Sequence, residues 1–201
     1  METRELGLYI GGMAFLIILS AYFSATETAF TSVNRIKLKN MAGDGNMRAK
    51  KVLLLEERYD TLLSTILVGN NIANIATTAI ATVFFVNLYG RYGPTISTIV
   101  ITVTVLIFGE ISPKNLAKEY PEKFAMFSAP LISLLMTVFT PINWIFAQWK
   151  KLLRLIFKVN LDKGITEEEI KTLVEEAATE GNIMSEQEEL IQNAIDFSDL
   201  E

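Results

Sequence analysis

The chain has 201 residues, half of them hydrophobic, and its formal net charge is −5. It contains neither cysteine nor histidine, which excludes disulfides, thiolate or imidazole zinc sites, a cysteine nucleophile and a histidine-based catalytic triad. Any bound metal must therefore have oxygen ligands, which magnesium, calcium, manganese and alkali cations prefer. An intramembrane aspartyl protease is also disfavoured because the apolar segments contain no aspartate. We expect a protein that is not an enzyme.

Charge is unevenly distributed along the chain. Residues 1–161 carry 16 basic and 10 acidic side chains, whereas residues 162–201 carry 2 basic and 13 acidic ones. This asymmetry predicts two parts in different surroundings. We expect a transmembrane domain over residues 1–158 and a cytoplasmic acidic helical region over residues 159–201.

The first predicted membrane span begins near the N-terminus. Residues 6–23 form an apolar run in which Ser20 is the one strongly polar member, and helix-like sequence continues to Arg35. This length suffices to cross a bilayer. A cleaved signal peptide is disfavoured because the run is too long and acidic residues outnumber basic ones before it.

Polar and apolar segments then alternate. Residues 34–60 are basic and amphipathic, and the Gly-Asp-Gly sequence at 43–45 predicts two short helices joined by a turn. A second span covers about residues 61–88, and a third runs from Thr95 to about Ser112. The pattern predicts an all-α membrane protein with three transmembrane helices and a cytoplasmic helical hairpin between the first two.

Basic residues predict the orientation of these spans. The 34–60 loop contains seven Lys or Arg residues, while the N-terminus and the 89–93 loop contain one each. By the positive-inside rule the 34–60 loop is cytoplasmic and the N-terminus lies outside. We therefore expect a multi-pass protein of the plasma (cell inner) membrane with a cytoplasmic C-terminus.

The apolar segment 124–149 permits two interpretations. It is long enough to span, but basic residues follow it from Lys150 to Lys158, and a fourth crossing would place them outside. Pro130 and Pro141 are also expected to break it into short pieces. We favour a juxtamembrane belt helix along the cytoplasmic leaflet, with its tryptophans as interface anchors.

The acidic region is predicted to be a short soluble helical bundle. Thr166-x-x-Glu169 and Ser185-x-x-Glu188 both have the capping-box pattern, and Gly181 stands where the first helix should end. Its carboxylates are typical of a solvated helical face, although their density also suits cation attraction. The sequence stops without a closing element, and we expect a further domain after it.

Glu110 is the most informative single residue. It lies in an otherwise uncharged apolar stretch that begins at Pro94, where a carboxylate is costly unless it faces a polar cavity or a partner. Pro113 follows three residues later, and its missing N–H and its ring disrupt the helical bond to the Gly109 carbonyl. A carboxylate and a freed backbone oxygen at one depth predict a cation site.

Polar residues on the other two spans are predicted at the same depth. At ~1.5 Å per residue, Ser24, Asn71 and Glu110 each lie ~24–27 Å below the outer membrane face. Further polar residues on the first two spans accompany them: Ser20, Glu27, Thr28, Thr31, Asn70 and Asn74. This coincidence predicts one site between three helices.

Other roles for these residues stay open from the sequence. Membrane Ser and Thr side chains often bond to a carbonyl one turn back or permit close packing, and asparagines can join helices. Glu27 can pair with Arg35 or with a lysine, and Glu110 can pair with Lys114 one turn away. Pro113 argues against the Glu110–Lys114 pair, because a distorted turn beside a structural ion pair has no obvious purpose.

Four ordered motifs stand out along the chain. They are FSATETAFTSVNR at 23–35, LVGNNIANI at 67–75, FGEISPK at 108–114, and the acidic run ITEEEIKTLVEEAATEG that leads into MSEQEELIQNAIDF. In these motifs the chain resembles the membrane domain of the CorC/CNNM (cyclin M) family over essentially its whole length. The resemblance implies a homodimeric magnesium transporter, sodium-coupled and exporting, with three spans and a belt helix.

The resemblance also implies which residues hold the ion. They are Ser24, Asn70 or Asn71, Gly109 and Glu110. Secondary candidates for a second metal or a coupling sodium ion are Ser20, Glu27, Thr28 and Asn74, with Pro113 structural at the site. The alternative that we retain is a regulatory scaffold that senses a cation without moving it.

The resemblance and the small residues of the spans predict the partners. Paired CBS domains follow this region in the family, so nucleotide binding is expected only there, and no nucleic-acid partner is expected. Small residues on the first two spans permit close helix approach, which predicts a homodimer within the lipid bilayer: Gly11, Gly12, Ala14, Ala21, Ala73, Ala76 and Ala79.

Overall fold

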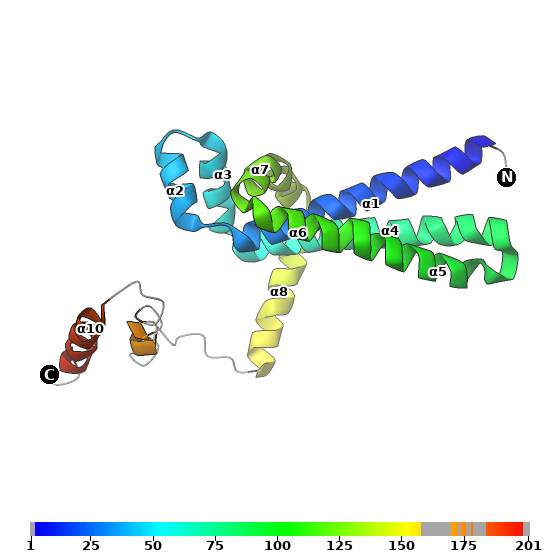
Figure 1. The fold of residues 1–201 in the computed structure, drawn as a ribbon. Helices are drawn as coiled ribbons and strands as arrows, with labels where there is room; N and C mark the ends of the chain where they lie inside the picture. Colours follow the sequence, from blue (N-terminus) through cyan, green and yellow to red (C-terminus); the bar gives the residue numbers. More distant parts are fainter. Residues whose placement is uncertain (1–2, 158–169, 173, 176–177, 179–183, 199–201) are drawn as a thin grey trace. The chain divides into compact units, whose positions relative to one another are not determined.

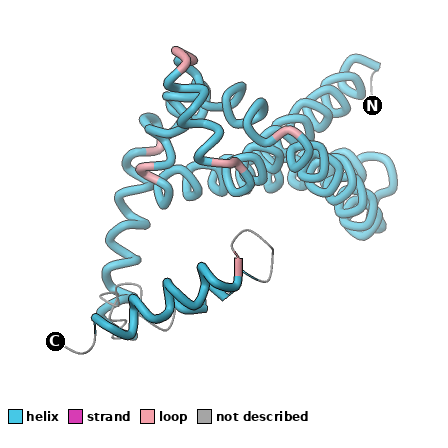
Figure 2. Tube along the Cα trace, turned by 60° about the vertical axis from the view of Figure 1, so that its left-hand side comes forward, coloured by secondary structure: helices cyan, strands magenta, loops and turns pink. Residues whose placement is uncertain are grey.

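The computed structural model of the chain is almost entirely helical. It describes residues 3–157, 170–172, 174–175, 178 and 184–198, and none of these lies in a β-strand. Figure 2 shows the helices of residues 3–157 joined by short loops. The prediction of an all-α membrane protein is confirmed. The chain divides into two compact units, Met1–Trp149 and Lys150–Glu201, and the domain boundary expected at residue 158 stays a prediction.

Among the described residues, two helical stretches are by themselves long and apolar enough to cross a membrane, Arg4–Ser32 and Tyr59–Glu119. The first lies in α1 (Thr3–Ser32). The second begins with α4 (Tyr59–Tyr89) and turns back at a short 3-10 helix, η1 (Gly90–Tyr92). Figure 1 shows that α4 and the returning limb lie side by side and that α1 runs antiparallel to α4.

The returning limb is a long helix that contains a π-helical stretch. α5 (Gly93–Thr104) leads into η2 (Val105–Ile111), and α6 (Ser112–Glu119) follows. The reversal before α5 depends on glycine, because Gly90 has a φ of 57°. A Cβ on Gly93 would lie 2.5 Å from the Val86 backbone. The third span is therefore packed closely on the second from its first residue.

The hairpin predicted between the first two spans is present. It consists of α2 (Arg35–Gly43) and α3 (Met47–Glu56), with Gly45 at a φ of 90° in the turn. Asn34 and Asn46 stand before the two helices, and their side chains accept backbone N–H bonds from the first turns. Such caps satisfy N–H groups that have no partner inside the helix.

The segment after the third span forms two helices, α7 (Pro121–Val138) and α8 (Thr140–Phe157), which bend by 74° at their junction. Together they have the length and hydropathy of a broken span or a re-entrant loop. Pro141 lies in the first turn of α8, where a proline is tolerated. The break expected at Pro130 was wrong, because Pro130 lies inside α7. The buried face of α7 packs against α1 and α3, and this packing outweighs the lost hydrogen bond. The belt arrangement stays a prediction.

In the acidic region the structure describes α10 (Ser185–Ser198). At its start the Met184 N–H donates a hydrogen bond to Gln187 Oε1 at 3.0 Å. The side chains of Ser185 and Glu188, which form the predicted cap, are not among those that the structure describes. The other predicted cap and the helix end at Gly181 lie outside the described residues.

The helices around the site are held by a core near the junction of α1 with the hairpin. Phe23 on α1 is buried in this core, which also includes Leu62 and Ile66 on α4. A Cβ on Gly69 would overlap the Phe23 ring. Since the next residue after Gly69 is Asn70, this close contact fixes where the asparagines of α4 stand relative to α1.

Candidate functional site

Polar side chains of α1 and α4 meet inside the apolar bundle. Ser20 Oγ donates a hydrogen bond to Asn70 Oδ1 at 2.9 Å, across 50 residues of sequence. Ser20 is fully buried. Few competing polar partners exist at this depth, so the bond fixes the two helices relative to each other.

The Glu110 carboxylate is held by an amide rather than by a base. Asn74 Nδ2 donates to Glu110 Oε1 at 3.4 Å, and no basic side chain in the described part of the chain forms an ion pair with Glu110. Lys114, the alternative partner from the sequence, lies 3.3 Å from Glu27 Oε2 instead. A membrane-depth carboxylate with no counter-charge favours a bound cation.

Two oxygens close to these contacts have no hydrogen-bond partner. Ser24 Oγ, one turn after Ser20 on α1, is completely buried and unpartnered. Asn74 Oδ1, on the amide that bonds to Glu110, is also buried and unpartnered. Buried polar atoms are nearly always satisfied by protein, water or an ion, so both oxygens are available as ligands.

Gly109 brings the backbone of η2 against α1. A Cβ at this position would lie 3.2 Å from Ser20 Oγ and 3.3 Å from Val105 Cγ1, which is tighter than ordinary van der Waals contact. The absence of a side chain therefore permits the approach. Gly109, Ser20 and Asn70 are brought to one place by three different helical segments.

The helical hydrogen-bond pattern widens just before Pro113. Residues 105–111 are π-helical, and the Ser112 N–H donates to the carbonyl of Ile107, five residues back. π-Helical turns occur frequently at functional sites. The sequence predicted a disturbed turn before Pro113, but it did not predict that the disturbance would be a π-helix containing both Gly109 and Glu110.

The remaining sequence candidates lie at the margin of the site. Asn71 is exposed, whereas Asn70 bonds to α1. Thr28 is buried, and Thr31 Oγ1 donates to the carbonyls of Glu27 and Thr28, which is the local role left open by the sequence. The structure thus gives Ser20 and Asn74 a more central place than the sequence did. Ser20 lies four residues before Ser24, and Asn74 lies four residues after Asn70. This spacing puts each pair on the same helix face, and it was the signal in the sequence for their role.

The site contains one carboxylate and several neutral oxygens. Within the described residues, no group of three or more His, Cys, Asp or Glu side chains is placed to hold a metal ion. A cation here would therefore depend on Glu110 for charge and on hydroxyl, amide and carbonyl oxygens for the other ligands. Such a set suits a hard cation that keeps part of its water.

Comparison with known proteins identifies the family. The cyclin M transmembrane N-terminal domain matches residues 11–189. The chain belongs to this family. It is 38% identical over 180 residues to a UPF0053 protein of Haemophilus influenzae, covering 88% of this chain and 43% of that protein. It is 37% identical over 166 residues to the UPF0053 inner membrane protein YfjD of Escherichia coli, covering 81% of this chain and 39% of the relative.

A third relative has a name that refers to transport. The polyamine export protein of Haemophilus influenzae is 30% identical over 197 residues, covering 90% of this chain and 46% of that protein. The chain spans about two fifths of the length of the first two relatives. The family and the long apolar helices show a membrane protein, and they support a role related to transport.

Proposed function

We propose that the protein transports magnesium ions across the membrane by sodium-coupled export, through the oxygen-lined site between α1, α4 and η2. The Glu110 carboxylate carries this proposal, because it has an amide donor but no ion-pair partner among the described side chains. The buried, unpartnered oxygens of Ser24 and Asn74 support it. These groups are costly in a membrane unless a cation or water satisfies them.

The available oxygens suit magnesium as the transported ion. Magnesium prefers six oxygen ligands at about 2.0–2.1 Å and sheds water reluctantly. Glu110 supplies the negative charge, while Asn70, the Gly109 carbonyl and Ser24 supply neutral oxygens to the ion in turn as it moves along the bundle. Asn70 Oδ1 accepts a bond from Ser20 and keeps a second lone pair for an ion. Water completes the shell.

For the coupling sodium ion we propose the neighbouring neutral groups. Ser20, Thr28 and Asn74 surround the primary set along the same helices. Glu27 joins this set only when Lys114 releases it, since the two side chains form an ion pair. Sodium requires less charge from its ligands than magnesium does, so neutral oxygens suffice.

We also propose a homodimer through α1 and α4. Gly11, Ala14 and Ala79 are exposed and permit close approach of a second copy. Ala73 is fully buried within the single chain, so it serves packing inside the protomer and not the interface. Crosslinking in native membranes tests the dimer, and monomer alone would contradict it.

Flux measurements test the proposed function. The purified chain is placed in liposomes that contain a magnesium-sensitive dye, with and without a sodium gradient across the membrane. We expect magnesium movement that increases with the opposing sodium gradient and is lost in Glu110→Gln. Magnesium binding by calorimetry without any flux would instead favour a sensor.

The name of the third relative defines a second assay. Spermidine is added as a competing cargo in the same liposomes, because that relative is named a polyamine export protein. We expect spermidine neither to move nor to inhibit magnesium flux. Sodium-driven spermidine movement without magnesium movement would replace the magnesium proposal with a polyamine one.

A further inference from the structure

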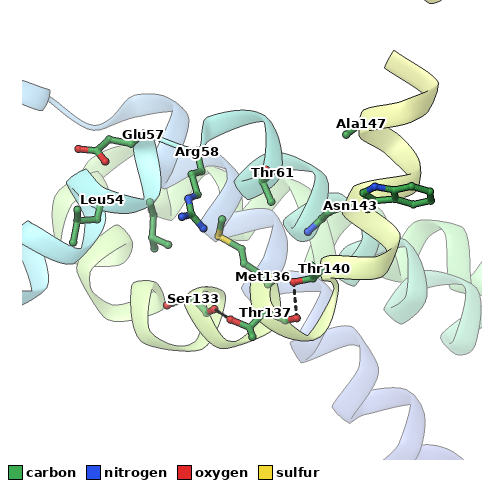
Figure 3. A pocket seen from close by; sticks show the side chains of 12 residues that line it. Leu54, Glu57, Arg58, Thr61, Ser133, Met136, Thr137, Thr140, Asn143 and Ala147 are labelled. Carbon is green, nitrogen blue, oxygen red and sulfur yellow. Dashed lines mark hydrogen bonds between the residues drawn. The ribbon is translucent and has the colours of Figure 1, made fainter. Parts of the chain in front are cut away.

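A second polar pocket lies apart from the candidate ion site. It has a volume of about 590 Å³ and is formed by the end of α3, the start of α4, the end of α7 and the start of α8 (Figure 3). None of its lining residues belongs to the candidate ion site. Its polar lining consists of one guanidinium, one carboxylate, one amide and several hydroxyl groups: Arg58, Glu57, Asn143, Thr61, Ser133, Thr137 and Thr140.

The threonine hydroxyls on α7 and α8 present acceptors to the pocket. Thr137 Oγ1 donates to the Ser133 carbonyl at 3.2 Å, and Thr140 Oγ1 donates to the Thr137 carbonyl at 2.8 Å. A hydroxyl whose proton is already used offers only its lone pairs to a ligand. These two threonine hydroxyls therefore accept hydrogen bonds from a ligand and do not donate them.

Asn143 contributes a further acceptor. Its Nδ2 donates to Thr65 Oγ1 at 3.0 Å, and Thr65 Oγ1 donates to the Thr61 carbonyl at 2.8 Å. These two bonds fix the direction of the Asn143 amide. Its Oδ1 is buried without a hydrogen-bond partner, so this residue of the lining keeps an acceptor that needs an N–H or O–H donor.

Arg58 supplies the positive charge of the pocket. Figure 3 shows its side chain extending toward Met136, while the Glu57 carboxylate points away from it. Among the described side chains, none forms an ion pair with the Arg58 guanidinium or accepts a hydrogen bond from it. The Glu57 carboxylate also belongs to the lining. It adds a negative charge, so a ligand with both charges suits this lining better than a purely anionic one.

We propose that this pocket binds the headgroup of a phosphoethanolamine lipid at the membrane surface. The phosphate lies at Arg58, and the ammonium group donates to Asn143 and to the threonine hydroxyls. Phosphocholine has the same charges but no N–H donor. Phosphoglycerol has hydroxyl donors but a net negative charge, which the Glu57 carboxylate in the lining disfavours. The pocket lies at the start of α4, where a membrane-spanning stretch begins, and Trp144 lines it, as expected at a membrane interface.

Trp144 provides a direct signal of pocket occupancy. The chain contains two tryptophans, so Trp149→Phe leaves Trp144 as the one reporter. The protein in detergent is titrated with short-chain phosphatidylethanolamine, phosphatidylcholine or phosphatidylglycerol, and Trp144 emission is recorded. We expect phosphatidylethanolamine to bind at least about fivefold more tightly than either of the others, because it alone combines an N–H donor with a headgroup of zero net charge.

Variants in the same background assign the two ends of the headgroup. Arg58→Gln should weaken phosphatidylethanolamine and phosphatidylcholine alike, by about tenfold. Asn143→Leu should remove the preference between those two lipids. Thr140→Val should reduce the same preference. It tests the ammonium end of the pocket independently if Asn143→Leu unfolds the protein by removing the bond to Thr65. Arg48→Gln and Asn87→Leu are matched controls, because both residues are exposed and neither lines the pocket.

Three results would overturn the proposal. They are equal affinity for the three lipids, tightest binding of phosphatidylglycerol, and affinities that respond to the control variants as strongly as to Arg58→Gln. Displacement of the short-chain lipid by spermidine at equal concentration would also overturn it, since it would identify the ligand as a free polyamine.

Discussion

Glu110→Gln is the sharpest test of the candidate ion site. The substitution keeps the size of the side chain and a carbonyl oxygen that can accept the bond from Asn74, but it removes the one negative charge at the site. The Glu110 carboxylate lies 3.4 Å from Asn74 Nδ2, and the other atom of that amide, Oδ1, is unpartnered. A cation bound between the two residues would therefore lie within ~4 Å of the carboxylate.

The charge sets the size of the expected effect. Two unit charges ~4 Å apart interact by about 4 kcal/mol at an effective dielectric constant of ~20, and a divalent ion doubles this value. Removing water from the ion and the carboxylate offsets more than half of that energy. We expect a net loss of ~3 kcal/mol of magnesium binding free energy, which corresponds to a roughly 150-fold larger dissociation constant.

Isothermal titration with magnesium chloride measures this loss directly. Glu119→Gln is the matched control, because Glu119 is exposed at the end of α6, and the same loss of charge there should leave the affinity within about twofold. Unchanged magnesium affinity in Glu110→Gln would refute the reasoning and move attention to Glu27 or to the acidic region.

Three further predictions concern other residues, two of them at the ion site and one on α3. Asn70→Ala should cost ~1–3 kcal/mol of magnesium binding, because it removes a ligand and leaves Ser20 without its acceptor, whereas Asn71→Ala should cost less than ~0.5 kcal/mol in the same calorimetry. Pro113→Ala should weaken magnesium binding by about fivefold without deleting a side-chain ligand, since an N–H at 113 can then bond to the Gly109 carbonyl; unchanged affinity together with unchanged amide exchange would contradict this. Burial raises the pKa of Glu56, and the charge of Arg35 offsets only part of this rise. A carboxyl whose pKa is raised by folding destabilises the protein as pH rises from its unfolded-state pKa toward its folded-state pKa. Glu56→Gln should therefore raise the melting temperature at ~pH 7 more than at ~pH 4. A larger gain in melting temperature at the acidic pH would show that the charge of Arg35 outweighs the effect of burial.

The membrane spans and the hairpin were predictable because their signals are local. Long apolar runs, a Gly-Asp-Gly turn and asparagines before two helices each determine structure within a few residues. Pro130 shows where this reasoning fails: proline disfavours a helix locally, but α7 continues through it because its buried face packs against α1 and α3. The π-helical stretch before Pro113 likewise depends on how the third limb packs, which no local pattern specifies.

A common depth for the site residues follows from helix geometry, but the direction of the side chains does not. A constant rise per residue is enough to align Ser24, Asn71 and Glu110 in depth. It gives no rotation of one helix about its axis relative to another, and so it cannot choose between Asn70 and Asn71. The ion-pair partner of Lys114 could not be predicted for the same reason. Glu110 is one helical turn away in sequence, but α6 packs against α1, and this packing brings Glu27 within reach of Lys114.

The two hydrogen bonds of the site and the unpartnered Ser24 Oγ lie on successive turns and not in one ring. α1 and α4 are antiparallel (Figure 1), so Asn74 is one turn farther toward the α4–α5 loop than Asn70, and Ser24 is one turn farther toward the hairpin than Ser20. The Asn74–Glu110 contact, the Ser20–Asn70 contact and the unpartnered Ser24 Oγ are therefore spaced at about one helical pitch, ~5.4 Å, along the bundle. We infer that an ion moves along these levels with its charge compensated at only one of them. A path of this kind attracts a cation without holding it at every step, which transport requires and storage does not.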